Sequence, residues 1–385
     1  LVLLVLDIYP PRRLVGGPKK WLGTEVRRIW WEKMPFFLLA FGLGAIALLA
    51  KSSTGALRPV QQYFLTYRLG QAFYGLCFYL WKTLVPVDLS PLYELPYDFD
   101  TWMPLFFLCG AIIVLITTAV YLFRKRYPAL LACWVYYLVV VTPVLGVAQS
   151  GPQIVADRYS YLACLSWAIL AGGTLSNFWK YTVEEFSWFS RFMTAPALAI
   201  VSVVLGFLTW NQTVVWRNTK TLWEHVIAVA PDSSIAHFNL GRFYELQSDF
   251  EKAIDYYQRA VSINPTLADA HYDLARLLAR RGLHGAAIEH YRVTLQFKPE
   301  AVDAYNNLGL SLASIGDIPA SIAQFQKAVK LNPRYAKGFF NLGRVAAQQG
   351  DFETAIRNFH TALRVSPDEA DIHFKLGEVL ARQGQ

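Results

Sequence analysis

The chain has 385 residues, of which 54% are hydrophobic and 15% aromatic, and its formal net charge is +8. These averages combine two unlike halves that meet near Asn211, because long apolar runs precede this residue and none follows it. Much of the positive excess lies in two short clusters beside apolar runs, which argues against nucleic-acid binding and for a membrane topology. The cysteines share no metal-ligand spacing, and we predict no metal site.

The amino-terminal half predicts a helical membrane domain. Several apolar runs approach the ~20 residues that span a bilayer. Basic clusters between Arg12 and Lys33 and at Arg124 to Arg126 mark two loops as cytoplasmic. The runs that we expect to cross the membrane are Pro35 to Ala50, Trp102 to Phe123, Ala129 to Ala148, Tyr161 to Ser176 and Pro196 to Trp210.

One further run, Val60 to Pro86, should not cross, because a crossing there would place Arg124 to Arg126 outside. Its Gln, Arg and Lys residues among many aromatic ones favour an interfacial or re-entrant helix on the outer face. The acidic loop around Asp88, the loop containing Asp157 and Arg158, and everything after Asn211 then share the outer side.

The second half is a repeat array. Prolines recur every 34 residues, which is the period of the tetratricopeptide helix-turn-helix repeat. Glycines recur in the turn between the two helices of each repeat, with Ser248 as the one departure. Four full repeats cover roughly 234 to 367, and a fifth is incomplete. Before them, Thr219 to Ala230 matches a second helix without its first. The period is carried by Pro231, Pro265, Pro299, Pro333 and Pro367.

A row of polar residues precedes the repeated leucine of the first helices. Because first helices line the concave face of such solenoids, these side chains should face a groove. Amides offer both donors and acceptors, so a row of them can hold the backbone of an extended peptide. This placement resembles the asparagine ladder of O-GlcNAc transferase repeats; the alternative is a tolerated polar residue on a solvated face. The predicted peptide-groove residues are Asn239, Asp273, Asn307 and Asn341.

Two stretches of the first half carry a resemblance to a known family. They are "YLWKTLVPVDLSPLY", from Tyr79 to Tyr93, and "QIVADRYSYLACL", from Gln153 to Leu165. Followed by tetratricopeptide repeats, they resemble the transmembrane-and-tetratricopeptide-repeat O-mannosyltransferases and their bacterial relatives. The resemblance implies a glycosyltransferase that uses a polyprenyl- or dolichyl-phosphate sugar at the outer or luminal membrane face. In that class the catalytic carboxylate lies in the first outer loop, upstream of this sequence, so we expect the catalytic residue to be missing here.

The residues that the resemblance carries over are Lys82, Asp157, Arg158 and Tyr159. The planar guanidinium of Arg158 matches phosphate oxygens two at a time, so it is the candidate partner of the lipid phosphate. Asp157 would orient Arg158 or a sugar hydroxyl, and Lys82 would supply a second cation. The alternative is that both cations extend to lipid headgroups and that Asp157 caps the following helix.

The sequence therefore predicts an all-α chain with a polytopic helical membrane domain over 1–210, a connecting helix over 211–233 and an α-solenoid of tetratricopeptide repeats over 234–385. Its expected partners are membrane lipid, a lipid-linked sugar as donor substrate, and an acceptor polypeptide or partner protein on the repeats, with no other cofactor. The expected location is a bacterial inner membrane with periplasmic repeats, or the endoplasmic reticulum with luminal repeats. Two alternatives stay open, a non-catalytic membrane-anchored repeat scaffold for envelope or secretion complexes and a polysaccharide ligase or polymerase.

Overall fold

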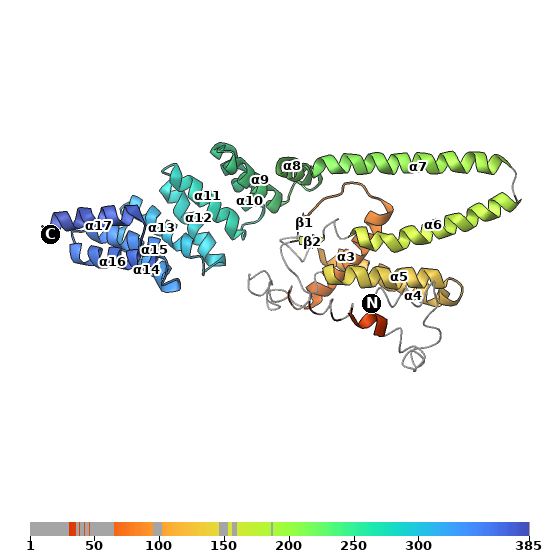
Figure 1. Cartoon of the computed structure of the whole chain (residues 1–385), viewed down its shortest axis with the longest axis horizontal. Coiled ribbons are helices and arrows are strands. Elements are labelled where there is room, and N and C mark those ends of the chain that lie inside the picture. Colours follow the sequence, from red (N-terminus) through yellow and green to blue (C-terminus); the bar gives the residue numbers. More distant parts are fainter. Residues whose placement is uncertain are drawn as a thin grey trace. The chain divides into compact units, whose positions relative to one another are not determined.

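The structure is a computed structural model and describes residues 31–35, 38, 42, 46, 65–94, 102–145, 153–155, 160–185 and 188–384 (Figure 1). The chain divides into two compact units, Leu1–Pro231 and Asp232–Gln385. We describe each unit by itself.

The first unit is built from long helices and one short antiparallel strand pair. Helices α5, α6 and α7 run along a common direction, whereas α3 crosses that direction steeply (Figure 1). Strand β1 pairs with β2, with Tyr93 opposite Val155. The elements are α3 (Leu65–Leu84), β1 (Tyr93–Glu94), α4 (Met103–Leu122), α5 (Pro128–Val141), β2 (Gln153–Val155), α6 (Ser160–Glu185), α7 (Trp188–Val215) and α8 (Thr219–Val229).

The core of the first unit lies where α3, α4, α5 and the start of α6 meet. Trp134 and Tyr137 of α5 are fully buried and stacked, with ring centroids 5.5 Å apart. Their polar atoms are satisfied across helices, since the Trp134 Nε1–H donates to Thr117 Oγ1 at 3.2 Å and the Tyr137 hydroxyl donates to the Leu76 carbonyl at 2.5 Å. Buried polar groups paired in this way fix how the helices cross.

The helix bounds differ from the predicted runs in two places. Helix α5 ends at Val141 and a 3-10 turn follows over Thr142–Val144, because Pro143 cannot continue the ladder of backbone hydrogen bonds. The predicted inner loop after Ser176 is instead helical at the end of α6 and the start of α7, and Pro196 lies inside α7. Only residues 186–187 between these helices are left undescribed.

Among the described residues, one helix is long and apolar enough to cross a bilayer, over Met103–Lys125, with a mean hydropathy of 2.5 and 22% of its most apolar stretch buried. A second span arises only if the bent pair Ala199–Val215 and Thr219–Val229 counts as one. Helix α3 does not meet the criterion, and the run Pro35 to Ala50 lies mostly outside the described residues. The polytopic domain over 1–210 therefore stays a prediction.

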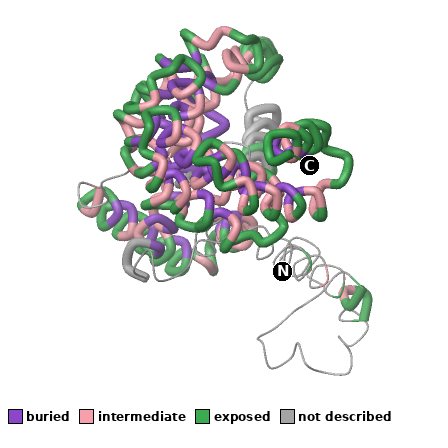
Figure 2. Tube along the Cα trace, turned by 90° about the vertical axis from the view of Figure 1, so that its left-hand side faces the viewer, coloured by how far each residue is buried: buried purple, intermediate pink, exposed green. Residues whose placement is uncertain are grey.

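The second unit is a stack of paired helices, which gives an all-α solenoid. Each first helix of a pair packs against the second helix of its own repeat, and each second helix packs against the first helix of the next repeat. Figure 2 shows buried segments in purple inside this stack and exposed segments in green outside it. The pairs are α9 (Ser234–Leu246) with α10 (Phe250–Ile263), α11 (Ala268–Arg280) with α12 (His284–Phe297), α13 (Val302–Ser314) with α14 (Ile318–Leu331), and α15 (Ala336–Gln348) with α16 (Phe352–Val365); α17 (Ala370–Gln383) is the unpaired first helix of the fifth repeat.

The repeated residues explain the repeated geometry. Gly309 lets α13 approach α14 closely, because a Cβ atom there would lie 2.6 Å from the ring of the buried Phe325. The turn glycines adopt positive φ, and Ser248 adopts φ 62° at the equivalent position, which strains a residue with a Cβ atom. Asp249, Asp317 and Asp351 accept hydrogen bonds from backbone amides at the starts of α10, α14 and α16.

Candidate functional site

The first helices of the later repeats enclose a groove with a volume of about 530 Å³. Helices α11, α13, α15 and α17 supply its lining, together with the turns that precede α15 and α17. The lining alternates amides, aromatic rings and charged groups, and includes Tyr272, Asn306, Asn307, Tyr335, Phe340 and Asn341.

The predicted row of polar residues divides into two parts. Asn307 and Asn341 line the groove. Asn239 does not, and its Nδ2 instead donates to the Ile235 carbonyl of its own helix at 2.8 Å. Asp273 pairs with Arg276 at 3.2 Å, and neither Asn239 nor Asp273 is among the groove residues. The structure thus brings together the two asparagines of the third and fourth repeats.

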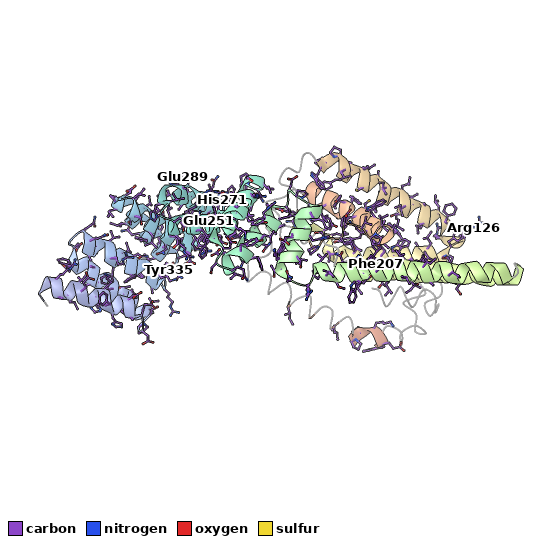
Figure 3. All side chains as sticks on the ribbon, turned by 90° about the horizontal axis from the view of Figure 1, so that it is seen from above. Arg126, Phe207, Glu251, His271, Glu289 and Tyr335 are labelled. Carbon is purple, nitrogen blue, oxygen red and sulfur yellow. The ribbon has the colours of Figure 1, made fainter. Side chains whose placement is uncertain are left out.

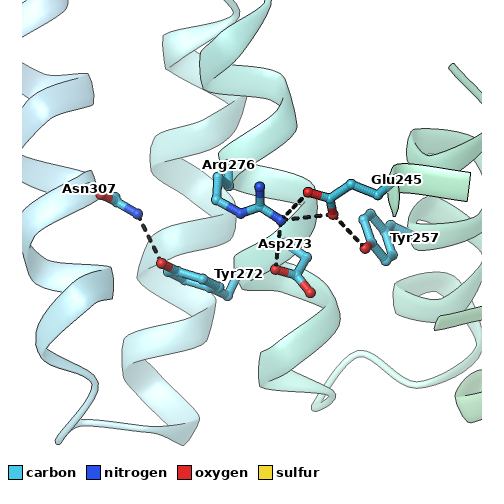
Figure 4. Close-up of polar contacts among 6 residues, drawn as sticks. All are labelled: Glu245, Tyr257, Tyr272, Asp273, Arg276 and Asn307. Carbon is cyan, nitrogen blue, oxygen red and sulfur yellow. Dashed lines mark hydrogen bonds and ion pairs between the residues drawn. The ribbon is translucent and has the colours of Figure 1, made fainter. Parts of the chain in front are cut away.

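The groove asparagines belong to a chain of side-chain hydrogen bonds that we call the amide chain. Asn341 Nδ2 donates to Asn306 Oδ1 at 2.8 Å, Asn306 Nδ2 donates to Asn307 Oδ1 at 3.2 Å, and Asn307 Nδ2 donates to the Tyr272 hydroxyl at 3.0 Å. Figure 4 shows the last of these bonds. Asn306 and Asn341 are only 4% and 6% exposed, so the chain is held rigidly between helices.

Sequence reasoning missed Asn306, which links the two predicted asparagines. Its position, two residues before the repeated leucine, is aromatic in every other repeat, as Phe238, Tyr272, Phe340 and Phe374. The sequence signal that could have identified Asn306 is therefore an amide at a repeat position that is otherwise aromatic.

A charged cluster joins the end of α9 to the middle of α11, the first helices of the first two repeats (Figure 4). Arg276 donates to Glu245 at 2.6 Å and to Asp273 at 3.2 Å, and the Tyr257 hydroxyl donates to Glu245 Oε2 at 2.9 Å. Burial raises the pKa of Asp273, and the nearby Arg276 charge partly offsets this. The carboxylates of Glu245 and Asp273 neutralise the charge of Arg276. Arg276 therefore offers the groove hydrogen-bond donors and little net positive charge.

Acidic groups dominate the remaining charge of the groove. Asp303 Oδ1 accepts a hydrogen bond of 2.7 Å from the Tyr335 hydroxyl, and burial together with this bond raises the pKa of Tyr335. Glu369 and Asp371 at the start of α17 are exposed, and so is Lys337, which also lines the groove.

Two histidines of the second repeat contact each other between α11 and α12. The two Nδ1 atoms of His271 and His290 lie 2.9 Å apart, and His271 Nε2 contacts the Pro265 carbonyl at 3.1 Å. Since a carbonyl only accepts, His271 carries its proton on Nε2 and accepts from His290 through Nδ1. Burial lowers the pKa of His271 to about 4. His271 is labelled in Figure 3. No group of three or more potential metal ligands occurs among the residues that the structure describes.

The first unit brings together segments that are far apart in sequence. The β1–β2 pair joins the two family-like stretches, since Tyr93 ends one and Gln153 begins the other. The carbonyl of Leu89 accepts a hydrogen bond from Gln212 Nε2 at 3.3 Å and contacts His225 Nε2 at 2.9 Å. The loop after α3 is therefore tied to β2, to the end of α7 and to α8.

Lys82 lies next to this loop, but it is already engaged. Its Nζ donates to the carbonyls of Val87 and Asp88 at 2.6 and 3.1 Å, and it lies 5.6 Å from the ring centroid of Tyr93. The other predicted donor-binding residues, Asp157, Arg158 and Tyr159, lie outside the described residues. Of the four predicted donor-binding residues, Lys82 is therefore the one that lies within the described residues.

Comparisons with known proteins concern the second unit. Tetratricopeptide-repeat family models match residues 234–267, 272–336, 324–357 and 343–384. No curated protein is significantly similar in sequence to this chain.

Solved repeat structures resemble part of the chain at low identity. The MamA protein is 23% identical over 40% of this chain and 84% of its own length, with a TM-score of 0.38. YrrB, described as a TPR protein with an unusual peptide-binding site, is 18% identical over 46% and 88%, with a TM-score of 0.39. A thermophilic TPR protein of Thermus thermophilus is 23% identical over 40% and 84%, with a TM-score of 0.35. With the helix pairs and their period, the family matches identify residues 234–384 as an array of tetratricopeptide repeats.

Proposed function

We propose that this chain is a membrane-anchored repeat protein that binds an extended segment of a partner polypeptide in the groove of its tetratricopeptide array. The amide chain is the observation that carries the proposal. Repeat arrays use their concave surface for protein partners, and this groove has side chains suited to a peptide backbone.

The amides keep bonding capacity for a ligand. An asparagine side chain has two N–H donors and an oxygen with two lone pairs. Within the amide chain, Asn306 and Asn307 each use one donor and one lone pair. Asn306 is buried, so the donor and lone pair left for a ligand are those of the partly exposed Asn307, and they match one C=O and one N–H group of an extended peptide. The internal bonds orient the amides before binding, which lowers the entropy lost on association.

The test is substitution of the amide at the centre of the chain. Asn307→Ala in the full-length protein in detergent should weaken binding to a random-composition peptide array at least tenfold, because it removes a peptide contact and leaves Asn306 without its acceptor. Asn239→Ala is the matched control, since Asn239 occupies the same repeat position but bonds its own helix. Equal binding by both variants would contradict the proposal.

The apolar outer surface of the first unit supports anchoring. Phe107, Leu115 and Leu122 of α4 are 74%, 72% and 69% exposed, and α7 adds Val203 and Phe207 at 70% and 62%. Phe207 projects from α7 in Figure 3, and Arg126 lies at the turn after α4. Contiguous exposed apolar surface of this kind is unfavourable in water and favourable in hydrocarbon. The basic turn then lies at the cytoplasmic end of α4.

A second candidate is the glycosyltransferase activity that the family resemblance implies. The observation that favours it is the β1–β2 pair, which holds the two family-like stretches side by side next to Lys82. This candidate rests on those residues alone, since no curated relative supports it. Its donor would be a polyprenyl- or dolichyl-phosphate sugar, and the resemblance implies mannose as the sugar. Arg158 would bind the phosphate, with Asp157, Tyr159 and Lys82 around it.

The test of this candidate uses membranes that contain the complete protein. Arg158→Ala should reduce sugar transfer from a radiolabelled polyprenyl-phosphate sugar by at least a hundredfold at unchanged expression. Arg126→Ala, at the basic turn after α4, should leave the transfer unchanged. Wild-type transfer by the Arg158 variant would remove the phosphate role, and absence of transfer by the parent protein would leave the binding function as the only activity.

A further inference from the structure

We infer that the groove selects an extended segment carrying a lysine or arginine, held against the carboxylates of Asp303, Glu369 and Asp371. This inference rests on the proposed peptide binding and names the chemistry of the partner. All three carboxylates line the groove.

The charge of the groove is unbalanced. Arg276 is compensated by Glu245 and Asp273 at 2.6 and 3.2 Å. By contrast, no basic side chain of the described residues lies within the 4.0 Å of an ion pair from Asp303, Glu369 or Asp371. Among the described residues that line the groove, three carboxylates and one cation, Lys337, thus have no ion-pair partner. A concave surface concentrates the field of such groups, so the groove attracts positive charge.

Aromatic rings beside the carboxylates suit the other part of a basic side chain. Tyr335 and Phe340 line the same groove. Arg344 already lies 5.8 Å from the ring centroid of Phe340, whereas Tyr335 is fixed beside Asp303 by the 2.7 Å bond of its hydroxyl. A lysine or arginine places its apolar stem on a ring and its charged end at a carboxylate, and the ring face attracts the cation. A glutamine or glutamate lacks this combination.

The acids also have a structural role that the test must separate. Asp303 and Asp371 lie in the first turns of α13 and α17, where negative charge stabilises a helix. The equivalent residue of α15 is Lys337, however, so the helix start does not require an acid. Amide replacements remove the charge and retain hydrogen-bonding ability at these positions.

The length of the ligand follows from the repeat spacing. The groove extends over four first helices, from α11 to α17. Three interhelical steps of about 9 Å span about 27 Å, which an extended chain covers with about eight residues.

The experiment uses fluorescent peptides of that length with a Gly-Ser backbone and two variable positions filled by lysine, arginine, glutamine or glutamate. Binding to the full chain in detergent is measured by anisotropy at low and high ionic strength. We expect lysine and arginine peptides to bind at least fivefold tighter than the glutamine peptide, with the difference reduced by salt. Glu369→Gln with Asp371→Asn should remove about fivefold of the affinity for the basic peptides and leave the glutamine peptide unaffected.

The matched control removes the same charge outside the groove, with Glu353→Gln on α16 and Asp255→Asn on α10; it should leave the basic peptides within about twofold. Far-ultraviolet circular dichroism of each variant confirms that the helices are retained. If all peptides bind equally and Asn307→Ala weakens them all, peptide binding stands and the basic preference is overturned. If no peptide binds, the proposed function fails and the preference fails with it.

Discussion

Helices α4 and α16 differ in where their apolar residues lie and in whether they carry charge. In α16, Ala355, Phe359 and Ala362 are buried, and Glu353 and Arg357 are exposed. In α4, the apolar residues are both buried, as Phe106 and Ile113, and exposed, as Leu115 and Leu122. The difference shows that the repeat unit hides its apolar surface inside itself, whereas the first unit directs much of it outward. Five substitutions or conditions test this contrast.

The largest effect should come from removing a ring that the repeat unit hides. Phe325 is fully buried against Gly309, so Phe325→Ala should lower the free energy of unfolding of residues 232–385 by about 3–5 kcal/mol. Phe374 is 70% exposed, and Phe374→Ala should change it by less than about 0.5 kcal/mol. Urea unfolding of both variants makes the comparison, and equal midpoints would contradict it.

The next effect compares two exposed leucines. Leu115 of α4 and Leu246 of α9 are 72% and 83% exposed. If α4 faces lipid, Leu115→Lys should disfavour its insertion by about 3 kcal/mol, because a charged side chain is costly within the bilayer. Leu246→Lys should be neutral. The fraction of protein that remains in membranes after an alkaline carbonate wash distinguishes the two, and full retention of the Leu115 variant would speak against a lipid-facing α4.

A third test uses pH, because the repeat unit buries a histidine as well as rings. The folded pKa of His271, about 4, is below its ordinary value of 6.5, so the unfolded state binds more protons between these values. Stability is therefore complete above pH 6.5 and falls as the pH drops, by about 2 kcal/mol at pH 5. His290, which faces it, also has a pKa lowered by burial, with Glu289 acting in the opposite direction.

The control for this test comes from the next repeat, which has Tyr305 and Gln324 at the equivalent positions. The double variant His271→Tyr, His290→Gln should lose the stability change between pH 6.5 and pH 5 measured by urea unfolding. If the free energy of unfolding of the double variant changes with pH as much as that of the parent chain, the pH dependence comes from other groups.

A smaller effect concerns the turn that departs from the repeat pattern. Ser248 has φ 62°, whereas Gly316 and Gly350 have φ 86° and 81° in the equivalent turns of later repeats. Ser248→Gly should raise the stability of the repeat unit by about 1 kcal/mol, because glycine adopts this conformation without a Cβ clash. Thermal unfolding measures the gain, and a loss would mean that the Ser248 side chain makes a stabilising contact.

The smallest effect concerns a missing helix cap. Leu283 precedes α12 at the position where Asp249, Asp317 and Asp351 cap the equivalent helices. Leu283→Asp should add about 0.5–1 kcal/mol by accepting a hydrogen bond from the first turn. Leu283→Asn separates this bond from the added charge, and no gain in either variant would contradict the capping explanation.

The period predicted the repeat unit well because its helices depend on local residues. Proline follows each second helix, glycine or Ser248 forms each turn, and small residues face the rings, so the pattern repeats with the geometry. The groove was predictable only in part. Asn307 and Asn341 followed from the row of polar residues. That row does not show that Asn239 bonds a carbonyl of its own helix, and the linking role of Asn306 depends on a contact between repeats.

The first unit shows the same limit more strongly. Apolar runs marked α4 and α5. They did not indicate that β1 pairs with β2, or that the Leu89 carbonyl contacts Gln212 and His225, which lie 123 and 136 positions away in the sequence. Periodicity carries no information about such pairs, and composition located only the helices. The non-crossing prediction for Val60 to Pro86 is compatible with α3, which fails the apolarity criterion.

The amide chain also has a polarity. Arg344 donates to Asn341 Oδ1 at 3.4 Å, and a guanidinium has no lone pair to accept with. Asn341 must therefore present its oxygen to Arg344 and its nitrogen to Asn306, and the same order passes through Asn307 to the Tyr272 hydroxyl. Reversal of any one amide would set donor against donor. The two directions along the groove are therefore not equivalent. A polypeptide bound in one orientation meets donors and acceptors in a different order from one bound in the reverse orientation.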